Sequence, residues 1–175
     1  MTRICIGVSG AIASGKSSVA AALAIVLDGY VIYAGDVIRQ AAPAATTRAE
    51  LAEVGERLAS ESQGRWLADA VTAYRQHQGR DAVIIDAVRR VEEDAALREA
   101  DPKRYARVHC VTREDVRQER VARRGFAPPS TPAVEAAEAD LPVLRNTADL
   151  VLDTTEIGAA EAAERILVAL GGNTR

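Results

Sequence analysis

Residues 10–17, with the sequence Gly-Ala-Ile-Ala-Ser-Gly-Lys-Ser, constrain this chain more than any other stretch. They complete the pattern GxxxxGK[ST] between an apolar run that ends at Val8 and the helix-prone segment 18–27. In this pattern a strand leads into a loop whose glycines let backbone N–H groups turn inward around phosphates. The helix that follows points its positive N-terminal end at the same anion. We therefore predict a phosphate-binding loop held between a strand and a helix.

The side chains of this loop predict a site for ATP and Mg²⁺. The ammonium of Lys16 is expected to reach the β- and γ-phosphates, and the hydroxyl of Ser17 is expected to hold Mg²⁺. The chain has twenty arginines and only two lysines, so a lysine in the motif runs against the chain's own bias. A compact ammonium fits between phosphates where a planar guanidinium does not. The predicted ATP-binding residues are Gly10, Ala13, Ser14, Gly15, Lys16, Ser17 and Ser18.

The composition is that of an ordinary globular protein, and the length of 175 residues fits one domain, 1–175. A net charge of -3 and a pI near 5.5 exclude the basic footprint of a protein that binds nucleic acid polymers. No stretch approaches the roughly 18 unbroken apolar residues that a membrane span requires. A first strand that starts near Arg3 leaves no room for a signal peptide. We therefore expect a cytoplasmic protein.

The cysteines and histidines predict neither redox nor metal chemistry. Cys5 and Cys110 fall in predicted core strands without a pairing motif, so they are expected to be small buried apolar residues. His77 and His109 are far apart in the sequence and lack ligand spacing. No metal site built from these side chains is predicted.

Five short apolar runs alternate with helical patterns along the chain. The runs are expected at residues 3–8, 30–33, 81–86, 106–111 and 150–152. Helices are expected at residues 16–27, 37–41, 47–60, 63–78, 91–99, 113–124, 133–147 and 159–170. Asp36 is the expected N-cap of the second helix, and Pro142 is expected to interrupt the seventh. Strands that alternate with helices predict an α/β fold, with a five-stranded parallel sheet flanked by helices.

Charged residues that follow the strands are the candidates for chemistry, because ligands gather at the carboxyl ends of a parallel sheet. Asp86 closes the third apolar run and is predicted to hold Mg²⁺ with Ser17, directly or through water. Asp36 and Arg39 follow the second strand, and Arg89 follows the third. Arginine binds phosphate oxygens in a bidentate way, so these positions favour an acceptor that itself carries phosphate. The alternatives are a helix N-cap for Asp86 and ordinary solvated arginines.

Four arginines form a stripe on one predicted helix. Arg113, Arg117, Arg120 and Arg124 are spaced four, three and four residues apart, which places them on one face. The stripe leads into a Pro-rich loop at residues 125–132. One interpretation is a lid over about residues 120–135 that brings cations to a transferring phosphoryl group. The other is a solvated face softened by neighbouring acidic residues.

Together these residues resemble the nucleoside monophosphate kinase group of phosphate-loop kinases, in its adenylate kinase-like and deoxynucleoside monophosphate kinase branch. That branch has an Asp-x-x-Arg after the second strand and an Asp-Gly-x-Arg after the third. Here the two motifs look like Asp36–Arg39 and Asp86–Arg89, with alanine in place of the glycine. Residues 47–64 are similar to the acceptor-covering helices, residues 117–125 to the entry of the lid, and residues 146–153 to the last strand beside the adenine.

The resemblance implies an ATP:nucleoside monophosphate phosphotransferase with ATP and Mg²⁺ as cofactors. It implies nucleotide substrates, no nucleic acid or membrane partner, and a monomer or a homodimer. It places the acceptor against helices at about residues 36–78. The implied catalytic residues are Lys16, Asp36, Arg120 and Arg124. The implied acceptor-binding residues are Asp36, Arg39, Arg48 and Arg89.

Two alternatives stay open on the sequence. Dephospho-coenzyme A kinases share the opening loop, an Asp after the second strand and a similar ending. They have Asp-x-Pro-Leu-Leu after the third strand, where this chain has Asp86-Ala87-Val88-Arg89. A nucleotide-binding module without turnover is the third hypothesis. The base and sugar of the acceptor are left open.

Overall fold

The computed structural model describes residues 4–78, 81–125 and 138–171, without the side chains of Arg48 and Gln78. The strands are β1 (Ile4–Ser9), β2 (Tyr30–Tyr33), β3 (Ala82–Asp86), β4 (Tyr105–Val111) and β5 (Leu150–Asp153). The helices are α1 (Lys16–Val26), α2 (Ala34–Ala41), α3 (Arg48–Glu61), α4 (Arg65–Gln78), α5 (Val91–Ala100), α6 (Glu114–Arg123), α8 (Leu141–Asn146) and α9 (Ala159–Gly171). None of the helices in these ranges is long and apolar enough to cross a membrane.

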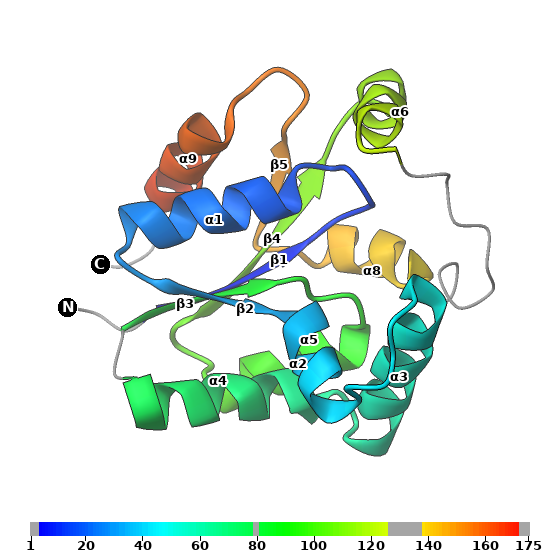
Figure 1. Ribbon diagram of the computed structural model, residues 1–175. Helices are drawn as coiled ribbons and strands as arrows, with labels where there is room; N and C mark the ends of the chain where they lie inside the picture. The colour runs from blue at the N-terminus through cyan, green and yellow to red at the C-terminus, as the bar shows by residue number, and fades with distance from the viewer. Residues whose placement is uncertain (1–3, 79–80, 126–137, 172–175) are drawn as a thin grey trace.

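The strands form one parallel sheet in the order β2-β3-β1-β4-β5, which confirms the predicted fold class. Helices α1 and α9 cover one face of the sheet, and α4 and α5 cover the other (Figure 1). β1 lies at the centre, between β3 and β4. The chain leaves β1 toward one edge of the sheet and later returns to fill the other, so the crevice at the carboxyl end of β1 is the natural place for a ligand.

The third strand shows why continuous apolar runs fold into this sheet. Successive side chains of a strand point to opposite faces. Val83 and Ile85 pack against α4 and α5, while Ile84 packs against α1 and α9. All three side chains are fully buried, and burial of each stabilises the fold by roughly 1.5–3 kcal/mol. With both faces covered, the carboxyl edge of the sheet is left for the polar residues.

Two predicted helix boundaries are wrong. Helix α2 begins at Ala34 with Tyr33 as its N-cap, so Asp36 lies in the first turn and is not the cap. The side chain of Ala34 is buried, so packing extends the helix through the glycine that follows. The interruption predicted at Pro142 comes two residues earlier, because residues 139–140 form a turn between the helical residue 138 and α8. Pro142 lies in the first turn of α8, where its missing N–H costs no helical hydrogen bond. The predicted helix residues 133–137 lie outside the described ranges.

Candidate functional site

The loop between β1 and α1 has the backbone geometry that its glycines require. Gly10 has a φ of 141° and Gly15 a φ of 86°, both in the region that favours glycine. A Cβ at Gly10 would lie 2.4 Å from the carbonyl oxygen of Cys110, so that position also needs glycine for space. Gly15 is the N-cap of α1 and no side chain caps this helix. The N–H groups of the first turn therefore suit an anionic ligand.

Lys16 lies in the first turn of α1 with its side chain buried. Its Nζ donates to the carbonyl oxygen of Ala11 at 3.0 Å. Burial first, and the neighbouring charge of Arg89 second, lower the pKa of Lys16 from 10.5 to about 8, while Asp86 and Glu138 oppose this shift. A phosphate beside this ammonium would compensate both the lost hydration and the repulsion from Arg89.

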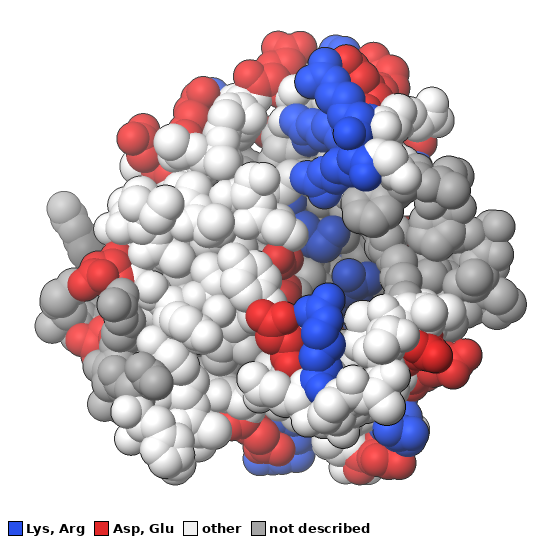
Figure 2. Space-filling model, viewed as in Figure 1, with Lys and Arg blue, Asp and Glu red and all other residues white. Residues whose placement is uncertain are grey.

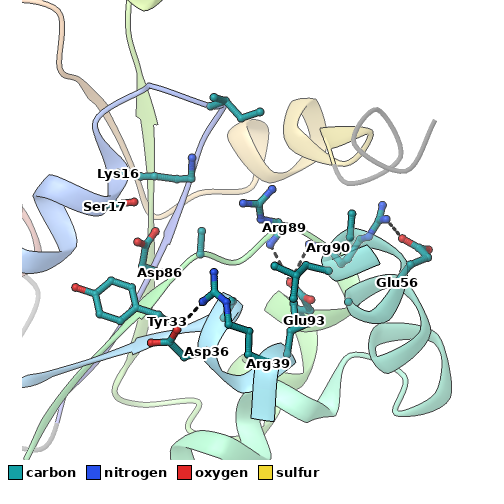
Figure 3. A pocket seen from close by; sticks show the side chains of 18 of the residues that line it. Lys16, Ser17, Tyr33, Asp36, Arg39, Glu56, Asp86, Arg89, Arg90 and Glu93 are labelled. Atoms are coloured by element: carbon teal, nitrogen blue, oxygen red, sulfur yellow. Dashed lines mark hydrogen bonds and ion pairs between the residues drawn. The ribbon is translucent and has the colours of Figure 1, made fainter. Parts of the chain in front are cut away.

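Ser17 and Asp86 supply oxygen atoms next to Lys16. Register places Asp86, the last residue of β3, beside Val8 just before the loop. Figure 3 shows the side chains of Ser17 and Asp86 adjacent to each other below Lys16. A hydroxyl and a carboxylate are the hard ligands that Mg²⁺ prefers. These two residues therefore fit the magnesium site predicted from the sequence.

A cavity of about 650 Å³ extends from this loop toward α2 and α3. Lys16, Ser17 and Asp86 line one end, and Ile38, Leu51 and Trp66 supply apolar lining at the other. Lys and Arg side chains gather along the hollow on this face of the molecule (Figure 2). One continuous space thus joins the phosphate loop to a second, partly apolar compartment.

Two predicted arginines line this cavity in different states of pairing. The Nη1 of Arg39 donates to Oδ1 of Asp36 at 2.7 Å, and both side chains are more than half exposed. The side chain of Arg89 makes no hydrogen bond or ion pair within the described ranges, although its charge acts on Lys16. Figure 3 shows both side chains extending into the space between the loop and the helices. Arg89 is therefore available to an anionic ligand, and Arg39 is oriented by Asp36.

The second compartment contains residues that the sequence reasoning missed. Glu93 is buried and accepts hydrogen bonds from the backbone N–H groups of Arg89 and Arg90 and from Nε1 of Trp66. Burial raises the pKa of Glu93, and these three donors oppose that shift. Arg90 pairs with Glu56 of α3. Glu93 lies three residues after Arg90, the N-cap of α5, but an arginine is not the Ser, Thr, Asp or Asn that marks a capping box in a sequence, so no local signal identified Glu93.

The arginine stripe divides into three parts. Arg113 and Arg117 pair with Asp115 and Glu114 respectively on the surface of α6. Nη2 of Arg120 donates to the carbonyl oxygen of Thr154 at 2.7 Å, next to the phosphate loop. The hydrogen bond of Arg120 thus joins α6 to the end of β5.

Arg124 alone among the stripe residues lines the cavity. The catalytic roles of Arg120 and Arg124 stay predictions. Within the predicted lid, residues 126–135 lie outside the described ranges, and so does the side chain of Arg48.

Comparison with protein families and solved structures adds a common architecture. The family model described as AAA domain matches residues 7–129. A shikimate kinase from Acinetobacter baumannii in complex with shikimate is 19% identical, with a TM-score of 0.68 over 99% of this chain and 97% of that chain. An APS kinase from Mycobacterium tuberculosis in complex with AMPPNP and APS is 20% identical, with a TM-score of 0.57 over 98% and 99% of the two chains.

A putative kinase from Chloroflexus aurantiacus is 22% identical, with a TM-score of 0.60 over 99% of this chain and 98% of that one. No curated protein matches the chain. At these identities the likeness is one of fold, and it extends over nearly the whole length of each chain. The architecture is that of small phosphate-loop kinases.

Proposed function

We propose that this chain, which belongs to the AAA domain family, is a kinase that transfers the γ-phosphoryl group of ATP to a small acceptor. One observation carries the proposal. A single cavity is lined by Lys16 of the phosphate loop and by the cationic side chains of Arg39 and Arg89. Donor and acceptor can therefore lie in one space, which is what transfer without release to water requires.

The residues at the loop end have defined tasks in this reaction. Loop N–H groups and Lys16 hold the donor phosphates and stabilise the charge that develops on the transferring group. Ser17 and Asp86 would hold Mg²⁺, which when bound neutralises charge on the β- and γ-phosphates. Little covalent chemistry is asked of the protein, so positioning supplies most of the rate. Among the similar folds, the APS kinase structure is a complex with AMPPNP and APS.

The finer proposal is that the acceptor is a nucleoside or deoxynucleoside monophosphate, giving the diphosphate and ADP. The side chain of Arg89 makes no hydrogen bond or ion pair with the described residues, and only its backbone N–H is bonded, to Glu93. A phosphate of the acceptor can therefore bind this side chain without breaking an existing ion pair. The lining residues Ile38, Leu51 and Trp66 provide an apolar wall of the kind that a planar base or sugar ring covers. An anionic group next to an apolar body is the chemistry that this compartment suits.

A second candidate is transfer to a hydroxyl group, as in a dephospho-coenzyme A kinase. Asp36 favours it, because its exposed carboxylate lines the same cavity at the end of β2. A hydroxyl has to lose a proton during attack, and a positioned base contributes about 10² to 10⁴ in rate. A monophosphate is already an oxyanion at neutral pH and needs no such base.

A coupled ADP-release assay over a panel of acceptors tests the proposal. The panel contains ribo- and deoxyribonucleoside monophosphates, dephospho-coenzyme A, shikimate, APS and simple hydroxyl compounds, with a Lys16→Ala variant as the blank. Turnover of a monophosphate, abolished in the blank, is the expected result. ATP binding without turnover of any acceptor would favour the non-catalytic module and contradict the kinase.

The pH profile of kcat for Asp36→Asn separates the two candidates. With a monophosphate acceptor, kcat of the variant is at most moderately lower than that of the parent. The pH profile of the parent then has no acidic limb that the substitution removes. An acidic limb present in the parent and lost in Asp36→Asn, together with a fall of about a hundredfold or more, would assign a hydroxyl acceptor instead.

A further inference from the structure

Glu138 contacts the phosphate loop from a distant part of the chain. The backbone N–H of Ile12 donates to Oε1 of Glu138 at 3.1 Å, across 126 positions of sequence. Ile12 is inside the GxxxxGK[ST] motif and lines the cavity. Backbone N–H groups of this loop are the donors that such motifs offer to phosphate oxygens. A carboxylate oxygen therefore occupies a donor of the kind that a phosphate uses.

The charge of Glu138 also acts on the centre of the loop. Lys16 is buried, and its pKa is lowered by burial first and by Arg89 second. Asp86 and Glu138 are the carboxylates that oppose this shift. Asp86 has a role in the proposed magnesium site, whereas the sequence motifs and the proposed reaction give Glu138 none. Its carboxylate meets the loop as an anionic ligand would.

The turn that follows Glu138 is anchored. The N–H of Val91, at the start of α5, donates to Oδ2 of Asp140 at 3.0 Å. The side chain of Leu144 in α8 is fully buried, and its N–H donates to the carbonyl oxygen of Asp140 at 2.9 Å. Asp140 thus ties the turn before α8 to α5 two residues after Glu138. The contact with Ile12 therefore comes from a residue two positions before this tie.

We propose that Glu138 is an internal competitor at the phosphate loop and a determinant of donor affinity. A phosphate group of ATP takes the Ile12 N–H in exchange for the Glu138 carboxylate, so part of the loop's binding free energy is spent on displacing it. The inference rests on the proposed function, because it assumes that this loop binds the donor. It adds a residue that weakens ATP binding and thereby favours release of a phosphate-bearing product.

Titration of the purified protein with ATP and with inorganic tripolyphosphate tests the proposal. Tripolyphosphate lacks base and sugar, so it reports on the loop alone. Glu138→Gln keeps the shape of the side chain and removes its charge. We expect Kd for both ligands to fall by roughly tenfold, the size of one competing charge-assisted hydrogen bond. Glu119→Gln removes an equal charge from the surface of α6 and should leave Kd unchanged.

A second variant separates the direct contact from a general effect of charge. Glu138→Asp keeps the negative charge and shortens the side chain by one methylene, so it should also bind tripolyphosphate more tightly than the parent. Tightening by Glu138→Gln alone would overturn the competition in favour of a simple charge effect. Unchanged or weaker binding in both variants, with parental melting temperatures, would overturn the proposal as a whole.

Lys16→Ala in the same titration distinguishes failure of the inference from failure of the proposed function. If Lys16→Ala weakens binding while the Glu138 variants change nothing, the loop is the donor site and only the competition is wrong. If Lys16→Ala binds both ligands as tightly as the parent, the donor site itself is wrong, and the proposed function fails with it.

Discussion

Lys16 should lower the free energy of unfolding of the protein while it contributes to kcat. The variant Lys16→Met tests both effects. The buried ammonium has its pKa lowered from 10.5 to about 8. At about 1.4 kcal/mol for each tenfold change in proton affinity, keeping the charge in the folded state at pH 7 costs roughly 3 kcal/mol. Methionine has a similar length and no charge. It loses the hydrogen bond to the carbonyl oxygen of Ala11, which offsets the gain by roughly 1–2 kcal/mol.

The net expectation is that Lys16→Met is more stable than the parent by about 1–2 kcal/mol at pH 7. For a chain of this size that raises the midpoint of thermal unfolding by roughly 2–4 °C per kcal/mol. The same variant should lose at least about a hundredfold in kcat, because a charge that stabilises the transferring group is gone. Urea and thermal unfolding, followed beside the coupled assay, give both quantities.

The pH dependence provides the sharper test. Between about pH 8 and pH 10.5 the unfolded chain keeps a proton on Lys16 that the folded chain has released. Stability rises with pH wherever the unfolded state binds more protons. The parent therefore gains stability across this window relative to Lys16→Met, and the advantage of the variant shrinks.

Lys103, the other lysine, is exposed, so Lys103→Met serves as the control and should show neither effect. A Lys16→Met protein that is less stable than the parent at pH 7, or a stability difference that does not change up to pH 10.5, would refute the reasoning.

The remaining predictions concern the arginines of the cavity. Arg89→Ala and Arg39→Ala should each raise KM for the acceptor much more than KM for ATP, because each removes a charged hydrogen bond to the acceptor that is worth roughly 1.5–3 kcal/mol. Equal increases in both KM values would mean that these arginines do not lie on the acceptor's side of the site. Arg124→Ala should lower kcat with little change in ATP affinity, because the charge it meets develops during transfer. A loss of stability with unchanged kcat in that variant would leave Arg124 on a solvated face. Arg117→Ala, which removes a residue paired with Glu114 on the same helix, is the matched control.

Local patterns were sufficient for the sheet and for the backbone of the loop between β1 and α1. The third strand was expected at residues 81–86 and is Ala82–Asp86, because a continuous apolar run that ends in a carboxylate contains its own boundaries. The phosphate loop could be predicted for the same reason, since its glycines, its lysine and its hydroxyl lie within residues 10–17. Each of these features is set within a few residues of sequence.

Contacts between segments that are distant in the sequence could not be predicted from local patterns. Glu93 meets Trp66 across 27 positions, and Arg120 meets Thr154 across 34. Helical spacing correctly placed Arg117 and Arg120 on one helix, while Arg113 and Arg124 are the N-cap and C-cap of α6. The three-residue separation of Glu114 and Arg117 could have identified that pair as a surface ion pair. The partner of Arg120 depends on where α6 packs against the end of β5. Periodicity carries no information on such packing.

The distribution of charge explains how an acidic protein can build a site for anions. The chain has a net charge of -3, but several carboxylates of the cavity already have partners. Asp36 pairs with Arg39, and Glu56 pairs with Arg90. Glu93 accepts three hydrogen bonds and is buried.

Once these groups are paired, the remaining charges of the described cavity lining are those of Lys16, Asp86, Arg89 and Arg124. Three of these four charges are positive, and with the Glu138 carboxylate beside Ile12 the balance is still positive, although the net charge of the chain is negative. A low-dielectric cleft strengthens such a local excess. The acceptor should therefore be selected by its negative charge first and by the apolar wall second, so a neutral acceptor with the same ring ought to be the poorer substrate.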